Sequence, residues 1–356
     1  MHNVVFVGID VDDKAYHVSI INHLGEFIAE GVRVKRNPGI LVKKIKCLSK
    51  KQTPVCVYEA TYAGYTLQRE ISSRGLECKI AAPTSIPRSP NQSVKNDRID
   101  SKVLAKGLRN NLFTYVHIPN VKEEADRQLV RARSFLVKQI SDHKRYLLSQ
   151  CRLAGLDYKL ESNSKSYWTK EHREWLDKKI MTLEKSYQIT LSILISTLEQ
   201  LIQQKDTIEN EVFSLAEEPN YKNQIDFLTC FKGIETVSAM VLITEIGDIN
   251  RFCHPKRLVS MIGLDISEYS SGGKCLQFGI SKMGNKRIRT VLVEACQMFN
   301  RSSTPSKRKS LKRKKKPSEA IAIADRCQKR LYKKGHRLLA RDKNRNKVKV
   351  ACAREM

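Results

Sequence analysis

Four carboxylates stand at positions in the sequence where acidic side chains can act together on a metal ion. Asp97 and Asp100 are three residues apart at the predicted start of a helix, and residues at this spacing share one helix face. Asp10 directly follows the apolar run 4–9, and Glu59 directly follows the apolar run 55–58. An acid at the end of a buried strand is costly unless water or a ligand satisfies it. The four acids therefore predict a divalent-metal site.

A helix cap is the alternative role for Asp97 and Asp100. An aspartate at the N-cap and an acid three residues later satisfy free backbone N–H groups and offset the helix dipole. Capping accounts for these two residues as well as metal binding does. It leaves Asp10 and Glu59 without a role, and this favours the metal site.

The length and charge of the chain suggest two domains and a polyanionic partner. At 356 residues the chain is long enough for about two domains and an element that connects them. The formal net charge is +28, and the last 56 residues hold 21 Lys and Arg against 4 Asp and Glu. This basic excess predicts nucleic acid as the partner. No apolar run approaches the roughly 20 residues that span a bilayer, so no membrane partner is expected.

The ten cysteines and eight histidines show no spacing typical of a zinc site. The N-terminus has neither the basic start nor the long apolar stretch of a signal peptide, so the chain is expected to stay in a reducing compartment with free thiols. We therefore expect a cytoplasmic, nucleoid-associated protein.

Residues 1–120 follow the order of strands and helices of the ribonuclease-H-like α/β fold. Three β-type runs come first, at 4–9, 16–21 and 26–34, with turn residues between them. They are followed by a helix, the strand 55–58, a second helix, the strand 78–82 and the helix that begins near Asp97. In this order the first strand and the strand 55–58 are spatial neighbours. Asp10 and Glu59 are therefore expected to converge on the Asp97 helix.

Residues 121–216 predict two long helices. Apolar residues recur every three or four positions from Leu129 to Leu147 and, after an interruption, from Leu176 to Leu215. This spacing is typical of coiled coils. A coiled-coil hairpin, a coiled coil across a dimer and an ordinary amphipathic pair within one subunit all fit the pattern. Trp168 and Trp175 lie where the second helix begins, and we expect them to pack at the tip of a hairpin.

Residues 217–300 predict a second compact unit with two features of interest. The segment 231–242 resembles a helix-hairpin-helix, whose glycine turn presents backbone N–H groups to a phosphate. A plain turn between two core helices explains this segment equally well. Ser270 and Ser271 precede Gly272-Gly273-Lys274 in a segment expected to be an exposed loop. A serine there can supply a hydroxyl nucleophile, although such a segment is usually only a flexible turn.

Residues 301–356 predict a basic tail that binds nucleic acid. A run of cations such as 312–316 is also typical of a nuclear import signal or of a solvated segment. Beside the four acids and the rest of the charge, contact with phosphates is the better account. The predicted nucleic-acid-binding residues are Lys282, Lys286, Arg287, Arg289, Lys312, Arg313, Lys314, Lys315 and Lys316.

Along nearly its whole length the chain resembles the DEDD-type transposases of the insertion-sequence-110 family, which include the Piv-like DNA invertases. The first half matches through residues 7–10, 58–61 and 95–101, and the second half through 233–234, 245–252, 263–264, 271–272, 280–285 and 351–355. Each fragment is short, and their order and spacing carry the resemblance. Two residues depart from the family pattern: Asn96 replaces the usual Thr, and Ile266 stands where Pro is common.

The resemblance implies a RuvC-like N-terminal domain, a coiled-coil dimerisation arm and a mainly α-helical C-terminal transposase domain. It implies that Asp10, Glu59, Asp97 and Asp100 bind Mg²⁺ or Mn²⁺ and that Ser271 is the nucleophile, with Ser270 as the alternative. Family members are guided by a structured RNA that the element encodes, which pairs with target and donor DNA. The expected partners are therefore DNA, a guide RNA and further copies of the chain, as a homodimer that assembles to a tetramer.

Carboxylate-bound metal ions and a serine together fit a DNA recombinase. Metal ions polarise the phosphate, and the serine forms a covalent link that keeps the phosphodiester energy. Strands can then be rejoined without ATP, in accord with a sequence that has no Walker-type motif. A metal-dependent junction-resolving or structure-specific nuclease that uses water is the main alternative, and it predicts that Ser271 is dispensable. A non-catalytic scaffold is the third possibility, and it predicts that all four acids are dispensable.

Overall fold

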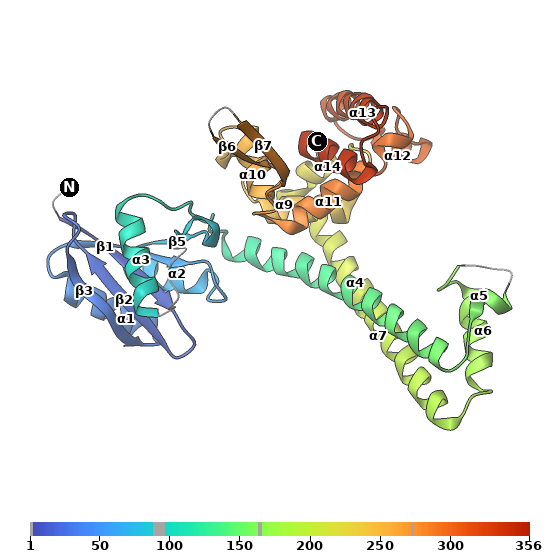
Figure 1. Ribbon diagram of the computed structural model, residues 1–356, viewed down its shortest axis with the longest axis horizontal. Coiled ribbons are helices and arrows are strands. Elements are labelled where there is room, and N and C mark those ends of the chain that lie inside the picture. Colours follow the sequence, from blue (N-terminus) through green and yellow to red (C-terminus); the bar gives the residue numbers. More distant parts are fainter. Residues whose placement is uncertain (1–2, 88–96, 163–165, 272–273) are drawn as a thin grey trace. The chain divides into compact units, whose positions relative to one another are not determined.

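The computed structural model describes residues 3–87, 97–162, 166–271 and 274–356. The side chains of six further residues lie outside this description: Asp97, Arg98, Ser271, Lys274, Cys275 and Asn300. The chain forms two compact units, Met1–Ile118 and Pro119–Met356, and each is taken by itself below (Figure 1). In the part of the chain that is described, no helix is long and apolar enough to cross a membrane.

The first unit is built on a five-stranded mixed sheet. Its strands are β1 (Val4–Val11), β2 (Ala15–Ile21), β3 (Phe27–Lys35), β4 (Thr53–Glu59) and β5 (Glu77–Ala81), in the spatial order β3-β2-β1-β4-β5. The pairs β1–β2 and β2–β3 are antiparallel, and the pairs β1–β4 and β4–β5 are parallel. The element order predicted from the sequence is thereby confirmed, including the neighbouring positions of the first and fourth strands.

Helices cover both faces of this sheet (Figure 1). On one face, α1 (Pro38–Ser49) and α2 (Thr66–Ser73) pack through residues such as Leu41 and Ile71 against Ile9 and its neighbours. On the other face, α3 (Asp97–Arg109) packs Leu104 against Val57. The short 3₁₀ turn η1 (Pro83–Ser85) follows β5. Because side chains alternate across a strand, the face that each strand residue occupies follows from its position.

The backbone of α3 touches β1 directly at a glycine. A Cβ atom built on Gly8 would lie 2.1 Å from the carbonyl oxygen of Ser101 and 2.4 Å from the backbone nitrogen of Ala105. The Ser101 hydroxyl is buried and hydrogen-bonded to the hydroxyl of Ser19 on β2 at 2.8 Å. The Ser19 oxygen also accepts the backbone N–H of Gly31. These contacts fix the height and rotation of α3 against the strand that carries Asp10.

The second unit begins with a long helical hairpin. The helices α4 (Val121–Leu153) and α7 (Lys185–Ala216) lie side by side in one chain, and α5 (Tyr158–Glu161) and α6 (Lys170–Ile180) stand at the far end of the pair (Figure 1). Asn120 and Glu123 form a capping box that begins α4. Buried residues seven apart, such as Leu191 and Leu198, hold the pair together. The two long helices predicted from the apolar spacing are confirmed as α4 and α7, but the second does not extend back to Leu176, which belongs to α6.

Aromatic side chains pack the end of this hairpin, as the sequence predicts for the two tryptophans. The ring of His172 lies 4.7 Å from that of Tyr158 and 5.4 Å from that of Trp168, and Trp175 stacks beside it. The backbone N–H of Trp168 donates to Nδ1 of His172. Burial lowers the pKa of His172, and its ring contacts make it a packing group at the end of the hairpin.

The rest of the second unit is mainly helical. Its helices are α8 (Pro219–Leu228), α9 (Thr236–Ile246), α10 (Pro255–Ile262), α11 (Lys286–Cys296), α12 (Lys307–Arg313), α13 (Ser318–Leu339) and α14 (Arg345–Glu355). The short 3₁₀ turns η2 (Ile249–Arg251) and η3 (Phe299–Arg301) lie between them. One antiparallel hairpin, formed by β6 (Ile266–Ser271) and β7 (Lys274–Ile280), interrupts the helices.

One hydrophobic core joins both ends of this unit. Val130 of α4 and Val212 of α7 pack with Met240 of α9, and Leu331 of α13 and Cys352 of α14 belong to the same core. The roots of the hairpin arm are therefore part of the core. Residues 301–356 do not form a separate tail, because they fold into helices and bury apolar side chains. The many cations in this segment made its apolar pattern hard to see in the sequence.

Candidate catalytic site and nucleic-acid surface

Asp10 and Glu59 follow directly on two residues that are paired in register on neighbouring parallel strands. Ile9 of β1 is paired with Tyr58 of β4, so the next residues on the two strands are Asp10 and Glu59. Ile9 and Tyr58 are completely buried in the core beneath α1 and α2. Because side chains alternate and neighbouring strands are about 4.8 Å apart, Asp10 and Glu59 lie close together on the opposite face, the one that α3 covers.

The first turn of α3 approaches the same face. Gly8 shares a sheet face with Asp10, two residues further along β1, and Gly8 is the point at which β1 touches α3. Asp97 is the first residue of α3, and Asp100 directly precedes the buried Ser101. Asp100 is partly buried, and the side chain of Asp97 lies outside the described residues. The structure therefore brings Asp10, Glu59 and the backbone that carries the other two acids to one side of the sheet.

The chemistry of this donor set suits a hard divalent cation. All four candidates offer carboxylate oxygens, which Mg²⁺ and Mn²⁺ prefer. Among the side chains that are described, no three His, Cys, Asp or Glu residues lie close enough to hold a metal ion. The Asp97 side chain is not one of them, so metal binding by Asp10, Glu59, Asp97 and Asp100 stays a prediction.

The two candidate serines lie on a strand. The sequence predicts an exposed loop here, but Ser270 and Ser271 end β6, where Ser271 is paired with Lys274 of β7. The Ser270 hydroxyl donates to Oε1 of Glu268 at 2.7 Å. The side chain of Ser271, together with Gly272 and Gly273, lies outside the described residues.

The hairpin that carries these serines is apolar at its surface. Tyr269 of β6 is paired with Leu276 of β7, and both are exposed, as is Phe278. These β-forming residues extend the strands up to the serines, which explains why the loop prediction was wrong. A lone two-stranded hairpin is marginal in water, so it needs support from the segments at its base.

A buried carboxylate, Glu245 of α9, joins the arm to the segment that follows the hairpin. Arg131 of α4 donates to it twice, from Nε to Oε1 at 2.7 Å and from Nη2 to Oε2 at 2.8 Å. Asn285 donates to Oε2 at 2.7 Å and, as the N-cap of α11, accepts the backbone N–H groups of Arg287 and Ile288. Burial raises the pKa of Glu245, but the hydrogen bonds from Arg131 and Asn285 outweigh it and leave the pKa below its ordinary value.

Further backbone contacts hold the base of the hairpin. The backbone N–H of Asn285 donates to the carbonyl oxygen of Met261, and that of Ser281 donates to the carbonyl oxygen of Asp265. A Cβ atom on Gly284 would lie 2.4 Å from the Met261 oxygen, so the two segments are in direct contact. Sequence reasoning missed the buried position of Glu245 and its bonds to Arg131 and Asn285. Its signal is an acid inside the apolar run of α9, which requires a partner.

The helix-hairpin-helix candidate is a turn between core helices. Gly233 has φ +82°, and a Cβ atom on it would lie 2.6 Å from the carbonyl oxygen of Ala295 in α11. Behind the turn, Lys309 is buried and donates to the carbonyl oxygen of Ile234 at 2.5 Å and to Glu235. Protein groups occupy the surroundings of this turn, and this favours the plain-turn interpretation over a phosphate site.

The predicted nucleic-acid-binding cations divide into two groups. Arg313 is buried, where it donates to the Cys230 carbonyl oxygen and pairs with Asp325 at 2.6 Å. Lys312 and Lys316 pair with Glu235 and Asp226, and Arg289 donates to the Ile262 carbonyl oxygen. These four stabilise the fold. Those that are well exposed are Lys282, Lys286, Arg287, Lys314 and Lys315, together with the paired Lys312, and Arg287 lies 3.8 Å from Oε1 of Glu245.

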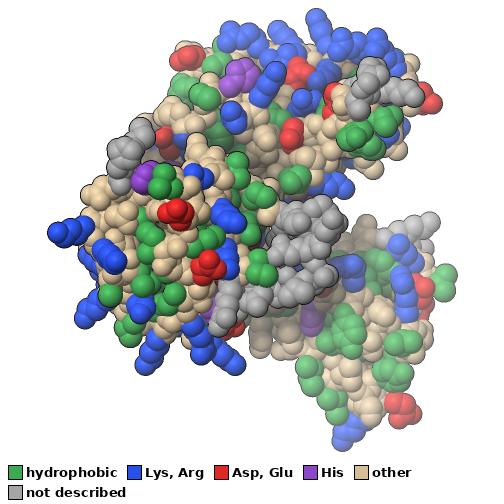
Figure 2. Space-filling view, turned by 60° about the vertical axis from the view of Figure 1, so that its left-hand side comes forward, with side chains coloured by type: hydrophobic (Ala, Val, Ile, Leu, Met, Phe, Trp, Pro, Cys, Tyr) green, Lys and Arg blue, Asp and Glu red, His purple; other side chains and the backbone are tan. Residues whose placement is uncertain are grey.

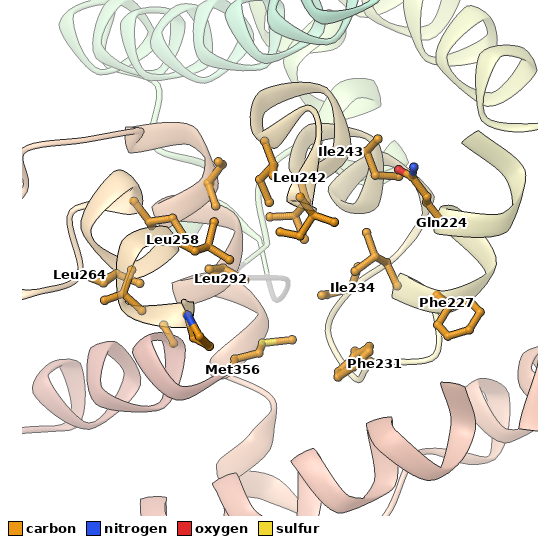
Figure 3. Close-up of a pocket in the computed structure, with 18 of the residues that line it drawn as sticks. Gln224, Phe227, Phe231, Ile234, Leu242, Ile243, Leu258, Leu264, Leu292 and Met356 are labelled. Atoms are coloured by element: carbon orange, nitrogen blue, oxygen red, sulfur yellow. The ribbon is translucent and has the colours of Figure 1, made fainter. Parts of the chain in front are cut away.

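A separate apolar pocket lies among the helices of the second unit. Figure 3 shows it between α8, α9, α10 and the C-terminal residues, with Phe227, Ile234, Leu258, Leu292 and Met356 around it. Its volume is about 710 Å³. None of the predicted catalytic residues lines it, so it has no part in the proposed chemistry.

Comparison with known proteins gives two family matches, one in each half of the chain. A family model of DEDD transposases of the IS110 type matches residues 7–153, and the model described as Transposase IS116/IS110/IS902 family matches residues 226–312. The first match covers the five-stranded sheet and the beginning of the arm. The second covers α9, the serine hairpin and α11. The predicted DEDD-type α/β N-terminal region and the mainly helical C-terminal region are confirmed.

Curated relatives match along almost the whole chain. A putative transposase y4qE of Sinorhizobium fredii is 30% identical over 359 residues, which cover 99% of this chain and 86% of the relative. The transposase for insertion sequence element IS1533 of Leptospira borgpetersenii is 27% identical and covers 94% of this chain and 96% of the relative. The transposase for insertion sequence element IS1328 of Yersinia enterocolitica is 24% identical over 84% of this chain and 85% of the relative.

Proposed function

The chain belongs to the IS116/IS110/IS902 family of transposases, and we propose that it cuts and rejoins DNA strands with Asp10, Glu59, Asp97, Asp100 and Ser271. The observation that carries this proposal is the common sheet face of Asp10, Glu59 and the start of α3. Two strands and the first turn of α3 would together present four carboxylates on this side of the sheet. A divalent cation explains this arrangement better than helix capping does.

The acids and the serine have different roles in the proposed reaction. Asp10, Glu59, Asp97 and Asp100 would hold Mg²⁺ or Mn²⁺, which would supply stabilisation of charge on the phosphate and its attacking and leaving oxygens. The Ser271 hydroxyl gives up its proton as its oxygen bonds to phosphorus, the bond from phosphorus to the sugar oxygen breaks, and that sugar oxygen takes up a proton. The product is a phosphoserine link and a free sugar hydroxyl. Attack by another sugar hydroxyl reverses these steps and rejoins the strands without ATP.

Glu268 is the nearest described group that can take a proton from the serine segment. Its carboxylate already accepts the hydroxyl hydrogen of Ser270 at 2.7 Å. This contact supports Ser270 as the alternative nucleophile, while the family resemblance favours Ser271. The choice between the two serines is an experimental question that a pair of matched substitutions answers.

The proposal extends to partners. The exposed Tyr269, Leu276 and Phe278 leave the serine hairpin with an apolar surface, which supports docking of the hairpin against the carboxylate unit of the same or another subunit. The resemblance adds a guide RNA and assembly from dimer to tetramer. Sequencing of nucleic acid that copurifies with the protein tests the RNA: the proposal predicts one structured species encoded beside the gene.

A water-using nuclease is the second candidate. All four acids belong to the first unit and both serines to the second. This separation favours the nuclease, because hydrolysis by metal-bound water needs the acids but not the serines. In that case no strand becomes linked to protein. The two candidates therefore differ in a covalent product that can be isolated.

The deciding experiment compares Ser271→Ala with Ser270→Ala on a nicked DNA substrate that traps intermediates. We expect the wild type and Ser270→Ala to form a Mg²⁺-dependent protein–DNA adduct, with the DNA mapped by mass spectrometry to the peptide that contains residue 271. Ser271→Ala should neither cleave nor form an adduct. If only Ser270→Ala loses the adduct, Ser270 is the nucleophile. Cleavage by both variants without any adduct establishes a nuclease that uses water.

A further inference from the structure

The exposed face of α13 carries a row of cations that the sequence did not single out. Arg326, Lys329, Lys333 and Arg337 are all exposed. With 3.6 residues per turn they fall within about a quarter of the helix circumference. The buried face of α13, with Ala324 and Leu331 among its residues, lies on the other side. We call the four cations the α13 ridge.

The α13 ridge differs from the other cations of its helix in having no folding role. Arg330 pairs with Glu355 at 2.9 Å, and Lys334 pairs with the same carboxylate. Asp325 is an acid of α13 itself, and it pairs with the buried Arg313. Within the described chain, none of the four ridge side chains forms a hydrogen bond or an ion pair. Charge repulsion among them is therefore retained in the folded protein, and a polyanion would relieve it.

The ridge has the size and shape of a duplex contact. Arg326 and Arg337 are separated by a helix rise of about 16 Å, which corresponds to roughly ten phosphate charges along the axis of B-DNA. The major groove of B-DNA, about 12 Å wide, admits an α-helix, whereas the major groove of A-form RNA is too narrow for side chains to read. Figure 2 shows Lys and Arg side chains along the upper edge of the view, where α12 and α13 lie.

We propose that the α13 ridge is a duplex-DNA contact surface of this transposase, held by phosphate contacts from Arg326, Lys329, Lys333 and Arg337. It replaces the run 312–316 as the main contact of the C-terminal segment, because Lys312, Arg313 and Lys316 of that run are engaged within the fold. This inference rests on the transposase function but not on the serine chemistry, and DNA binding alone tests it.

The test measures equilibrium binding to a DNA duplex over a range of salt concentrations, in buffer without divalent cations so that neither candidate reaction cuts a strand. The ridge variant carries Arg326→Gln, Lys329→Gln, Lys333→Gln and Arg337→Gln. A matched control, Lys43→Gln, Lys44→Gln, Lys50→Gln and Lys51→Gln, removes the same charge from exposed residues of α1 and the turn after it. Glutamine keeps helix propensity, and thermal melts check the fold.

Each phosphate contact contributes about −0.9 to the slope of log affinity against log salt. We expect the ridge variant to flatten this slope by about 3 to 4 and to weaken binding at least about tenfold at low salt. The α1 control should change the slope by less than about 1. The double variant Lys329→Gln and Lys333→Gln should show about half the effect, which keeps the test valid if the fourfold variant is unstable.

Two results overturn the proposal. The first is an unchanged slope and affinity in a folded ridge variant. The second is a ridge variant that keeps its affinity for duplex DNA but loses affinity for a structured RNA probe. This result would show that the ridge binds RNA and not DNA. Failure of the serine mechanism is a separate result, because it alters cleavage and adduct formation but not these binding slopes.

Discussion

At the scale of single residues, the pairing of two strands accounts for the proposed chemistry of Asp10 and Glu59. Each acid comes one residue after a completely buried side chain, and the two buried side chains are in register. The position of each acid at the end of an apolar run is visible in the sequence, because an acid at such a position is unusual. The contribution of Asp97 and Asp100 is not readable in the same way, since capping and metal binding need the same residues at the same spacing.

Substitution separates these two roles. We expect Asp97→Asn and Asp100→Asn to abolish Mg²⁺-dependent cleavage while the melting temperature stays near that of the wild type. If the pair only caps α3, each change should instead cost about 0.5 to 2 kcal/mol of stability and leave cleavage intact. Asp10→Asn and Glu59→Gln serve as comparisons, because neither residue lies in a helix.

Glu245 gives a prediction on pH dependence. Its pKa lies below the ordinary value of 4.5 in the folded chain, so the ion pair stabilises the protein above that pH and loses its effect as the pH falls through the folded pKa. Glu245→Gln should therefore lower the free energy of unfolding most at neutral pH. The difference from wild type should narrow below about pH 4.5.

Urea unfolding at pH 7 and pH 3.5 measures this difference, with the exposed Glu319→Gln as a control for loss of a surface charge. A gap between wild type and Glu245→Gln that stays constant across this range would contradict an ionised, hydrogen-bonded Glu245. The partner Arg131 is 114 residues away in the sequence, and for this reason the pair could not be predicted without a structure.

At the scale of elements, the position of α3 depends on the absence of a side chain at Gly8. Gly8→Ala should push the helix from β1, because the added carbon would lie 2.1 Å from the Ser101 oxygen. Overpacking of this kind costs about 1 to 3 kcal/mol, and we expect Mg²⁺-dependent cleavage to fall with it. Gly279→Ala adds the same methyl group where no atom lies within 4 Å, and it should have little effect. Urea midpoints like that of the wild type for both variants would show that α3 does not rest on β1.

The run 312–316 yields a second prediction at this scale. Arg313→Gln should lower stability by about 1 to 3 kcal/mol, because the Cys230 carbonyl oxygen and Asp325 lose their donor. Lys314→Gln, an exposed neighbour of the same charge type, should change stability by less than about 0.5 kcal/mol. Thermal melts of the two variants make the comparison, and equal melting temperatures would contradict a structural role for Arg313.

The elements differ in how far the sequence predicted them. The strands and helices of the first unit were predictable because period and turn residues agree along residues 4–82. The β6–β7 hairpin was not, since Ser270 and the glycines after Ser271 suggest a loop and outweigh the β-forming Tyr269 and Phe278. The cations of 301–356 suggest a solvated tail, and the sparse apolar residues that bury α13 and α14 are visible only once their common face is known.

At the scale of the whole molecule, the proposed reaction takes its acids from the first compact unit and its serine from the second. The serine beside the acids, Ser101, is buried and hydrogen-bonded to Ser19, and the described serine segment has no histidine beside it. Each unit supplies what the other lacks. An active site assembled in trans would also prevent a lone subunit from cutting DNA, because cleavage would wait for an assembled complex.

Mixing two inactive variants is the most direct test of this shared site. We expect neither Asp10→Asn nor Ser271→Ala to cleave DNA or form a protein–DNA adduct alone. The mixture should regain Mg²⁺-dependent cleavage, with the adduct only on the Asp10→Asn subunit, which keeps Ser271. Cleavage by Ser271→Ala alone, without an adduct on either serine, would contradict the account and leave a nuclease that uses water.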